Sequence, residues 1–194
     1  LIRYHEFILS GDHNYCIIMD YYDYDLFTYS NNKIFNENEI RDFIYQILTA
    51  IKYLEQNNYY HLDLKLENIL INKDNNNIVL TDFGSMSKIL RYKQYGDVTR
   101  SIGTKQYIAP EILTENKFYR NSDIWSLGLT TYILLNKYKI PEDDYDSKIE
   151  INNYIYRCKQ FSDECLNFLD LSIEPDYNKR LSINECLHHE WINI

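Results

Sequence analysis

Two clusters of polar residues flank a short predicted β-hairpin, and this arrangement constrains the chain more than any other feature. Two apolar runs, 68–71 and 78–80, are separated by a stretch of Asn, Lys and Asp that favours a turn. The polar residues before the hairpin are Asp63, Lys65 and Asn68, and the one after it is Asp82. Because a hairpin returns its ends to the same place, we expect Asp82 to lie beside Asn68.

These residue types are the ones that phosphoryl transfer requires. One carboxylate must accept the proton of the acceptor hydroxyl, and oxygen ligands must bind Mg²⁺. A cation is needed near the transferred group, and the reactants must be aligned. The sequence therefore predicts a site for this chemistry at the base of the hairpin.

Two motifs around the hairpin resemble those of protein kinases. The run from His61 to Asn68 (HLDLKLEN) is similar to the catalytic loop, and Asp82-Phe83-Gly84 is similar to the Asp-Phe-Gly motif. The resemblance implies ATP and Mg²⁺ as cofactors. It also implies roles for four residues: Asp63 as the catalytic base, Lys65 near the γ-phosphate, and Asn68 and Asp82 as the Mg²⁺ ligands.

Three further matches follow in the same order as in that family. Residues 103–111 (GTKQYIAPE) resemble the end of the activation segment, and 123–128 (DIWSLG) resemble the start of the central buried helix. Arg180 and the run 187–192 (LHHEWI) resemble the closing helix. The resemblance implies an ion pair between Glu111 and Arg180, Asp123 accepting hydrogen bonds from backbone amides near His61 and Leu62, and Trp125 in the core.

The end of the second predicted strand resembles the kinase hinge, although a strand and a turn alone would mean little. The resemblance implies Met19 as gatekeeper at the back of an adenine pocket. It further implies that the adenine edge bonds to backbone groups of Asp20 and Tyr22, that Asp25 faces the ribose hydroxyls, and that Leu70 forms the pocket floor.

Lys65 and Thr104 stand where serine/threonine kinases place a lysine and a bridging threonine. The sequence Lys-Leu-Glu-Asn at 65–68 is common in calcium/calmodulin-kinase-like and AMP-kinase-like groups. Glu67 occupies a position from which a carboxylate attracts basic substrates, so a basic protein substrate is a hypothesis. The alternative is that Glu67 is merely solvated.

The chain departs from the family pattern in two respects. Leu62 replaces the arginine that normally binds an activation-loop phosphate. We therefore expect activity to depend little on phosphorylation of Thr99 or Ser101. A Gly-rich phosphate loop, its lysine and its partner glutamate are also missing from the 194 residues. We expect these parts upstream of Leu1, and little activity from the fragment alone.

The predicted fold class is α+β, a protein-kinase-like fold with a mostly helical C-terminal lobe, a hinge and the remnant of a small β lobe. The expected division is 1–19 for the end of the N-terminal lobe, 20–26 for the hinge and 27–194 for the C-terminal lobe. Strands are predicted at 1–9 and 15–21 around a turn at 11–14.

A helix is predicted at 37–57, where apolar residues recur at helical spacing after a capping box of Asn36 and Glu39. A second box, Ser182 with Glu185, opens a final helix that runs into Trp191, and 91–101 and 141–150 are predicted loops.

Charge and cysteine content exclude several other classes. The 20 basic and 29 acidic side chains give a net charge of −9, which disfavours nucleic-acid and anionic-membrane partners. The four cysteines, Cys158 among them, match no zinc spacing, and reduced buried thiols are expected. No apolar run is long enough to span a bilayer. We therefore expect an intracellular protein, cytoplasmic or nuclear.

Two alternatives share the predicted fold. A pseudokinase that acts as a binding or scaffolding module agrees with Leu62 and the missing lysine, but the four polar residues around the hairpin argue against it. A kinase of small molecules is disfavoured by the peptide-anchoring segment 103–111.

Overall fold

A computed structural model describes residues 1–10, 14–99, 102–137 and 160–193. Several sequence predictions lie outside these ranges: Gly11, Asp12 and His13 of the first turn, Ser101, the loop at 141–150, and Cys158.

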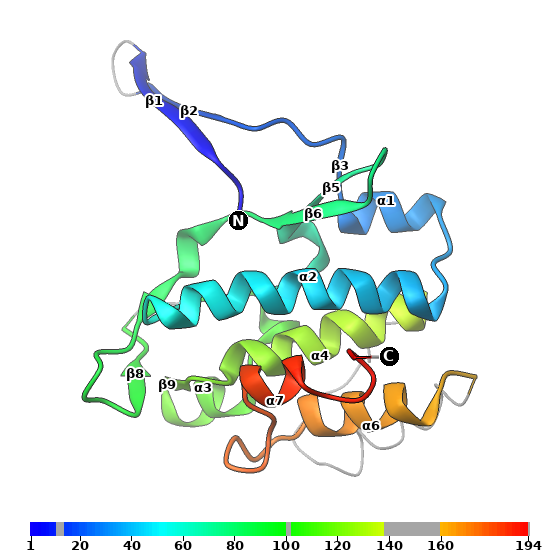
Figure 1. Cartoon of the computed structure of the whole chain (residues 1–194). Helices are drawn as coiled ribbons and strands as arrows, with labels where there is room; N and C mark the ends of the chain where they lie inside the picture. The colour runs from blue at the N-terminus through cyan, green and yellow to red at the C-terminus, as the bar shows by residue number, and fades with distance from the viewer. Residues whose placement is uncertain (11–13, 100–101, 138–159, 194) are drawn as a thin grey trace.

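The chain opens with a hairpin that projects away from the rest of the molecule (Figure 1). Strand β1 (Tyr4–Ser10) pairs antiparallel with β2 (Asn14–Met19), with Phe7 opposite Ile17. The hairpin carries apolar side chains in contact with solvent: Phe7 is 63% exposed and Leu9 is 64% exposed. Compared with the predicted 1–9, β1 begins later and ends one residue later, at Ser10. Compared with the predicted 15–21, β2 begins one residue earlier, at Asn14, and ends earlier.

A second small sheet lies above the helices and contains the predicted hairpin (Figure 1). Its strands are β3 (Tyr24–Asp25), β5 (Ile69–Asn72) and β6 (Asn77–Leu80), in the order β3-β5-β6. Ile69 pairs with Leu80, so the two ends of the β5–β6 hairpin meet, as predicted. Helix α1 (Leu26–Asn32) follows β3 directly.

Among the described residues, four helices form the main body. They are α2 (Glu37–Gln56), α4 (Ser122–Leu135), α6 (Asp163–Ser172) and α7 (Ile183–Leu187). The predicted capping box opens α2, because Asn36 and Glu39 exchange side-chain-to-backbone hydrogen bonds of 3.0 Å. Every residue of α4 is buried, so this helix is the centre of the core. Gly128 on α4 lets α6 approach: a Cβ there would lie 2.6 Å from Ile173 Cγ1.

Short elements connect these parts. Two-stranded ladders join β4 (Tyr59–Tyr60) to β7 (Ser87–Lys88) and β8 (Tyr95–Asp97) to β9 (Lys117–Tyr119). Helix α3 (Pro110–Glu115) precedes β9, and 3₁₀ turns cover Leu66–Asn68, Phe83–Ser85 and Lys105–Tyr107. The fold is α+β, in agreement with the sequence prediction. No helix in the described ranges is both long and apolar enough to cross a membrane.

Two predictions of local structure were wrong. The final helix does begin at the Ser182–Glu185 capping box, but it ends at Leu187, and Trp191 lies beyond it in a series of turns. Trp191 is nevertheless fully buried, because its side chain packs against Phe168 at a ring-centroid distance of 5.0 Å. The segment 91–101, predicted as a loop, contains β8, which only becomes a strand by pairing with β9.

The first turn of α2 carries a pH-sensitive contact that the sequence did not reveal. Glu37 accepts hydrogen bonds from Ser162 N at 3.0 Å, from Ser162 Oγ at 2.5 Å and from Trp191 Nε1 at 2.9 Å. Burial raises the pKa of Glu37, but the bonds from Ser162 and Trp191 outweigh it, so the pKa lies below its ordinary value of 4.5. The carboxylate thus ties the start of α2 to the N-terminus of α6 and to the end of the chain.

Replacing Glu37 with Gln is expected to lower the free energy of unfolding at pH 7 by about 1.5 kcal/mol, as for hydrogen bonds to a charged group. The folded-state pKa is depressed, so this stabilisation is complete above pH 4.5 and is lost as the pH falls through the lower folded-state value. Denaturant unfolding at several pH values should therefore show the two proteins converging in acid. The matched control is Asp42→Asn, an exposed carboxylate on α2. An equal acid dependence for both variants would contradict the assignment.

Candidate active site

Asp123 at the start of α4 organises the segment that carries the predicted base. Its two carboxylate oxygens accept hydrogen bonds of 2.8 Å from the backbone amides of His61 and Leu62. Burial raises the pKa of Asp123, and the neighbouring His61 and the two amides oppose that shift. The predicted contacts are present, and they allow Leu62 to adopt a left-handed backbone conformation with φ of 63°.

Asp63 is the centre of a small polar network. The residue is only 9% exposed. Its carboxylate accepts hydrogen bonds from Thr104 Oγ1 at 3.0 Å and from Asn68 Nδ2 at 3.0 Å. Lys65 Nζ lies 3.5 Å from Asp63 Oδ2 and donates to Thr104 Oγ1 at 2.7 Å. Thr104 therefore bridges Asp63 and Lys65, from a segment about forty residues further along the chain.

His61 connects this network to the residue that precedes Asp82. Its Nδ1 accepts a hydrogen bond from the amide of Asp63, so the ring proton resides on Nε2, which donates to the carbonyl of Thr81 at 3.0 Å. The amide of Thr81 in turn donates to the carbonyl of Asn68 at 3.0 Å. Asp82 is thereby fixed next to the 61–68 segment. Sequence reasoning gave His61 no role of its own, although its place in the motif was a usable signal.

Asn68 and Asp82 carry the oxygens expected to bind a metal. Asn68 directs Nδ2 at Asp63, which leaves Oδ1 available, and Asp82 Oδ1 accepts from the amide of Gly84 at 3.1 Å. Within the described ranges no hydrogen bond engages Asn68 Oδ1 or Asp82 Oδ2. No cluster of three or more His, Cys, Asp or Glu side chains there could by itself hold a metal. One amide and one carboxylate fit Mg²⁺, which takes its other oxygen ligands from water and phosphates.

Gly103 brings the segment 103–111 close to Asp63. Its φ of 68° is in the left-handed region, and a Cβ at this position would lie 2.7 Å from the carbonyl oxygen of Leu62. The amide of Gly103 donates to Ser85 Oγ at 3.2 Å, just after the Asp-Phe-Gly motif. Only glycine can pass this closely, and the next residue, Thr104, then reaches Asp63.

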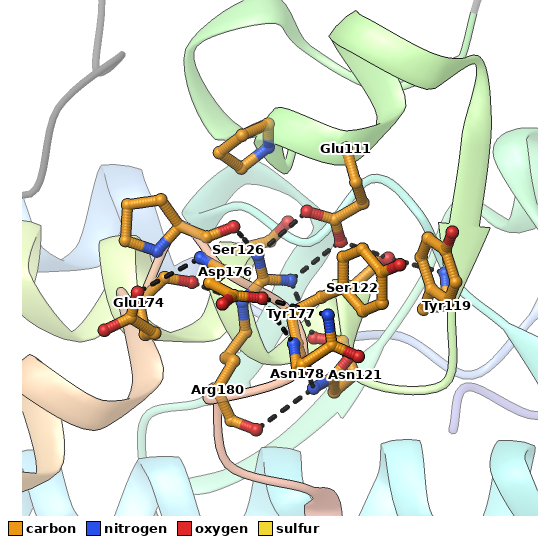
Figure 2. A network of polar contacts seen from close by, with 12 residues as sticks. Glu111, Tyr119, Asn121, Ser122, Ser126, Glu174, Asp176, Tyr177, Asn178 and Arg180 are labelled. Carbon is orange, nitrogen blue, oxygen red and sulfur yellow. Dashed lines mark hydrogen bonds and ion pairs between the residues drawn. The ribbon is translucent and has the colours of Figure 1, made fainter.

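A buried ion pair fixes the far end of that segment. Arg180 Nη1 and Nη2 donate to the two carboxylate oxygens of Glu111 at 2.7 and 2.8 Å, and both side chains are at most 2% exposed. Ser122 Oγ donates to Glu111 at 2.6 Å, and Arg180 Nε donates to the Glu174 carbonyl at 2.8 Å (Figure 2). The predicted pair therefore anchors α3 to α4 and to the loop after α6.

The predicted hinge residues lie between the projecting hairpin and α1. Met19 ends β2 and is 38% exposed. The amide of Asp20 donates to the Arg3 carbonyl at 3.1 Å. Leu70 is half-buried on the face of β5 opposite the fully buried Ile69 and Ile71. For Tyr22, burial and the nearby Asp20 raise the pKa.

Asp25 has a local function that accounts for it without a ligand. It is the N-cap of α1, where its two carboxylate oxygens accept from Thr28 N and Thr28 Oγ1, each at 2.7 Å. Sequence reasoning did not predict α1 and so did not foresee this cap.

Comparisons with known proteins identify the family of the chain. The family model described as "Protein kinase domain" matches residues 1–192. The chain is 34% identical over 99% of its length to a probable myosin light chain kinase of Dictyostelium discoideum. It is 32% identical over 81% of its length to a calcium/calmodulin-dependent protein kinase of Emericella nidulans, and 32% identical over its whole length to calcium-dependent protein kinase 4 of Plasmodium berghei.

These findings place the chain in the protein kinase domain family. The chain spans 41%, 41% and 38% of the length of these three relatives.

Proposed function

We propose that the protein phosphorylates serine or threonine residues of protein substrates, with ATP as donor and Mg²⁺ as the required ion. The observation that carries this proposal is the convergence of Asp63, Lys65, Asn68 and Thr104 within hydrogen-bonding distance of one another. A binding module has no need of a base, a cation and a metal-binding amide assembled in this way.

In the proposed mechanism Asp63 accepts the proton of the substrate hydroxyl. The bonds from Asn68 and Thr104 orient its carboxylate, and Lys65 supplies positive charge beside the group in transfer. Asn68 and Asp82 would hold Mg²⁺, which offsets the phosphate charge when bound. The hydroxyl of Thr104 keeps Lys65 near the base.

The nucleotide is proposed to bind beside the segment 20–26, the hinge between the N-terminal part (1–19) and the C-terminal lobe (27–194). Backbone groups of Asp20 and Tyr22 would bind the adenine edge, with Met19 behind it and Leu70 below. Asp25 would meet the ribose hydroxyls, which requires its carboxylate to serve a ligand and the α1 cap together.

Selection of a basic substrate is proposed to involve Glu67. The residue is exposed, next to Asn68 and on the same 3₁₀ turn. No carboxylate–cation pair is found for Glu67 in the described ranges, so its charge is available to an incoming arginine or lysine.

The proposal is tested with the protein that contains this chain, labelled ATP and a peptide array. Transfer of the γ-phosphate to serine and threonine, its loss when Mg²⁺ is chelated, and enrichment of arginine or lysine around the acceptor are the expected results. Phosphate on tyrosine alone would refute the acceptor assignment, and an array without basic enrichment would refute the role of Glu67. Binding of ATP without any transfer would favour a pseudokinase, the alternative that Leu62 at the usual arginine position supports.

A further inference from the structure

A cavity at the end of α2 lies outside the proposed catalytic machinery. Its volume is about 590 Å³, within the range of ligand-binding pockets. The walls come from the end of α2, the segment before β8, the β9–α4 connection and the loop before α7. Its lining residues are Glu55, Arg91, Tyr92, Lys93, Gln94, Tyr95, Tyr119, Arg120, Asn121, Tyr177, Asn178 and Ser182.

The cavity is basic although the chain is acidic. Three cations, Arg91, Lys93 and Arg120, line it against one carboxylate, Glu55, whereas the net charge of the chain is −9. Glu55 is already paired with Lys52 at 2.7 Å. Positive charge collected in a concave site on an acidic protein attracts an anionic ligand.

The two arginines of this cavity are not neutralised by the protein. In the described part of the chain neither Arg91 nor Arg120 forms an ion pair with a carboxylate. Arg120 is nevertheless held in position, because Nη1 donates to Tyr60 Oη at 3.1 Å and Nη2 to the Lys93 carbonyl at 3.5 Å. Lys93 contacts Asp97 at 3.4 Å, but both side chains are about half exposed, so solvent screens that pair.

An aromatic wall gives the cavity a rigid surface. The rings of Tyr119 and Tyr177 stack with centroids 3.7 Å apart, and Tyr95 contacts Tyr119 at 5.9 Å. Asn121 Nδ2 donates to the carbonyls of Tyr177 and Arg180, which connects this wall to the buried Glu111–Arg180 pair (Figure 2). At the rim Tyr92 is 83% exposed.

We propose that this cavity is a docking site for an acidic segment of a protein partner. Tyrosine and arginine are the residues most enriched at the energetic centres of protein interfaces, and both gather here around the unpaired charge. A nucleic acid is disfavoured because the net charge of −9 repels a long polyanion. An anionic membrane is disfavoured because lipid-binding clusters contain about four to eight basic residues.

The test is fluorescence anisotropy of a labelled decapeptide rich in Asp and Glu, titrated with the whole chain at low salt. Replacing Arg91 and Lys93 with Gln is expected to raise Kd about tenfold, the size of effect measured for close charge pairs across a protein interface. Both side chains are exposed, so the fold should survive, which a thermal melt checks.

The matched control removes two lysines at the other end of the molecule, Lys33→Gln with Lys73→Gln, and should change Kd less than about twofold. Asp63→Asn should leave peptide binding unchanged, which separates this docking site from the proposed kinase activity. Absence of binding, equal weakening by both double variants, or equal affinity for a single-stranded DNA of the same charge would overturn the proposal.

Discussion

Replacing Asp63 with Asn is expected to reduce the rate of phosphoryl transfer by about 10²–10⁴-fold, the usual contribution of a positioned general base. Asparagine has the same shape but keeps only one acceptor oxygen, so it cannot accept from both Asn68 and Thr104, and its amide cannot accept the proton of the substrate hydroxyl. The fold should still form, which a thermal melt checks. The measurement is kcat with labelled ATP, for the protein that contains this chain.

Two further variants make this result specific. Asp74→Asn makes the same chemical change in the exposed β5–β6 turn, and it should retain full activity. Thr104→Ser keeps the hydroxyl that bridges Asp63 and Lys65 and should be far less damaging than Thr104→Ala. An Asp63→Asn protein that retained a third or more of the wild-type rate would show that another group takes the proton.

Sequence reasoning placed residues correctly where their positions depend on neighbours along the chain or on a short hairpin. Asp63, Lys65 and Asn68 lie within one loop, and the β5–β6 ladder brings the chain back to them at Thr81. The capping boxes of α2 and α7 were equally readable, because each is closed within four residues.

The failures involve contacts between distant parts of the chain. Strand β8 exists only through pairing with β9, so its own residues carried no strand signal. Trp191 is buried by packing against α6 although no helix continues to it. Glu37 looked like an ordinary acidic residue in the first turn of a helix, and only the fold brings Ser162 and Trp191 to it.

Replacing Glu111 with Ala is expected to cost about 3–5 kcal/mol in the free energy of unfolding, the range for breaking one partner of a buried pair. Arg180 has a fully buried side chain, and its hydrogen bonds include two to the Glu111 carboxylate. The variant would leave that guanidinium charge buried without its carboxylate partner, and the Ser122 hydroxyl would lose its hydrogen-bond acceptor. Chemical denaturation followed by circular dichroism measures the loss.

An exposed ion pair provides the comparison. Asp97→Ala removes the carboxylate that faces Lys93, where the side chains are 57% and 43% exposed, and should cost less than about 1 kcal/mol. The double variant Glu111→Ala with Arg180→Met should lose less free energy of unfolding than the sum of the losses of the two single variants, because no unpaired charge is left buried. If Glu111→Ala unfolded like Asp97→Ala, the pair would not be the anchor of α3. The segment that carries Thr104 would then depend on other contacts to reach Asp63.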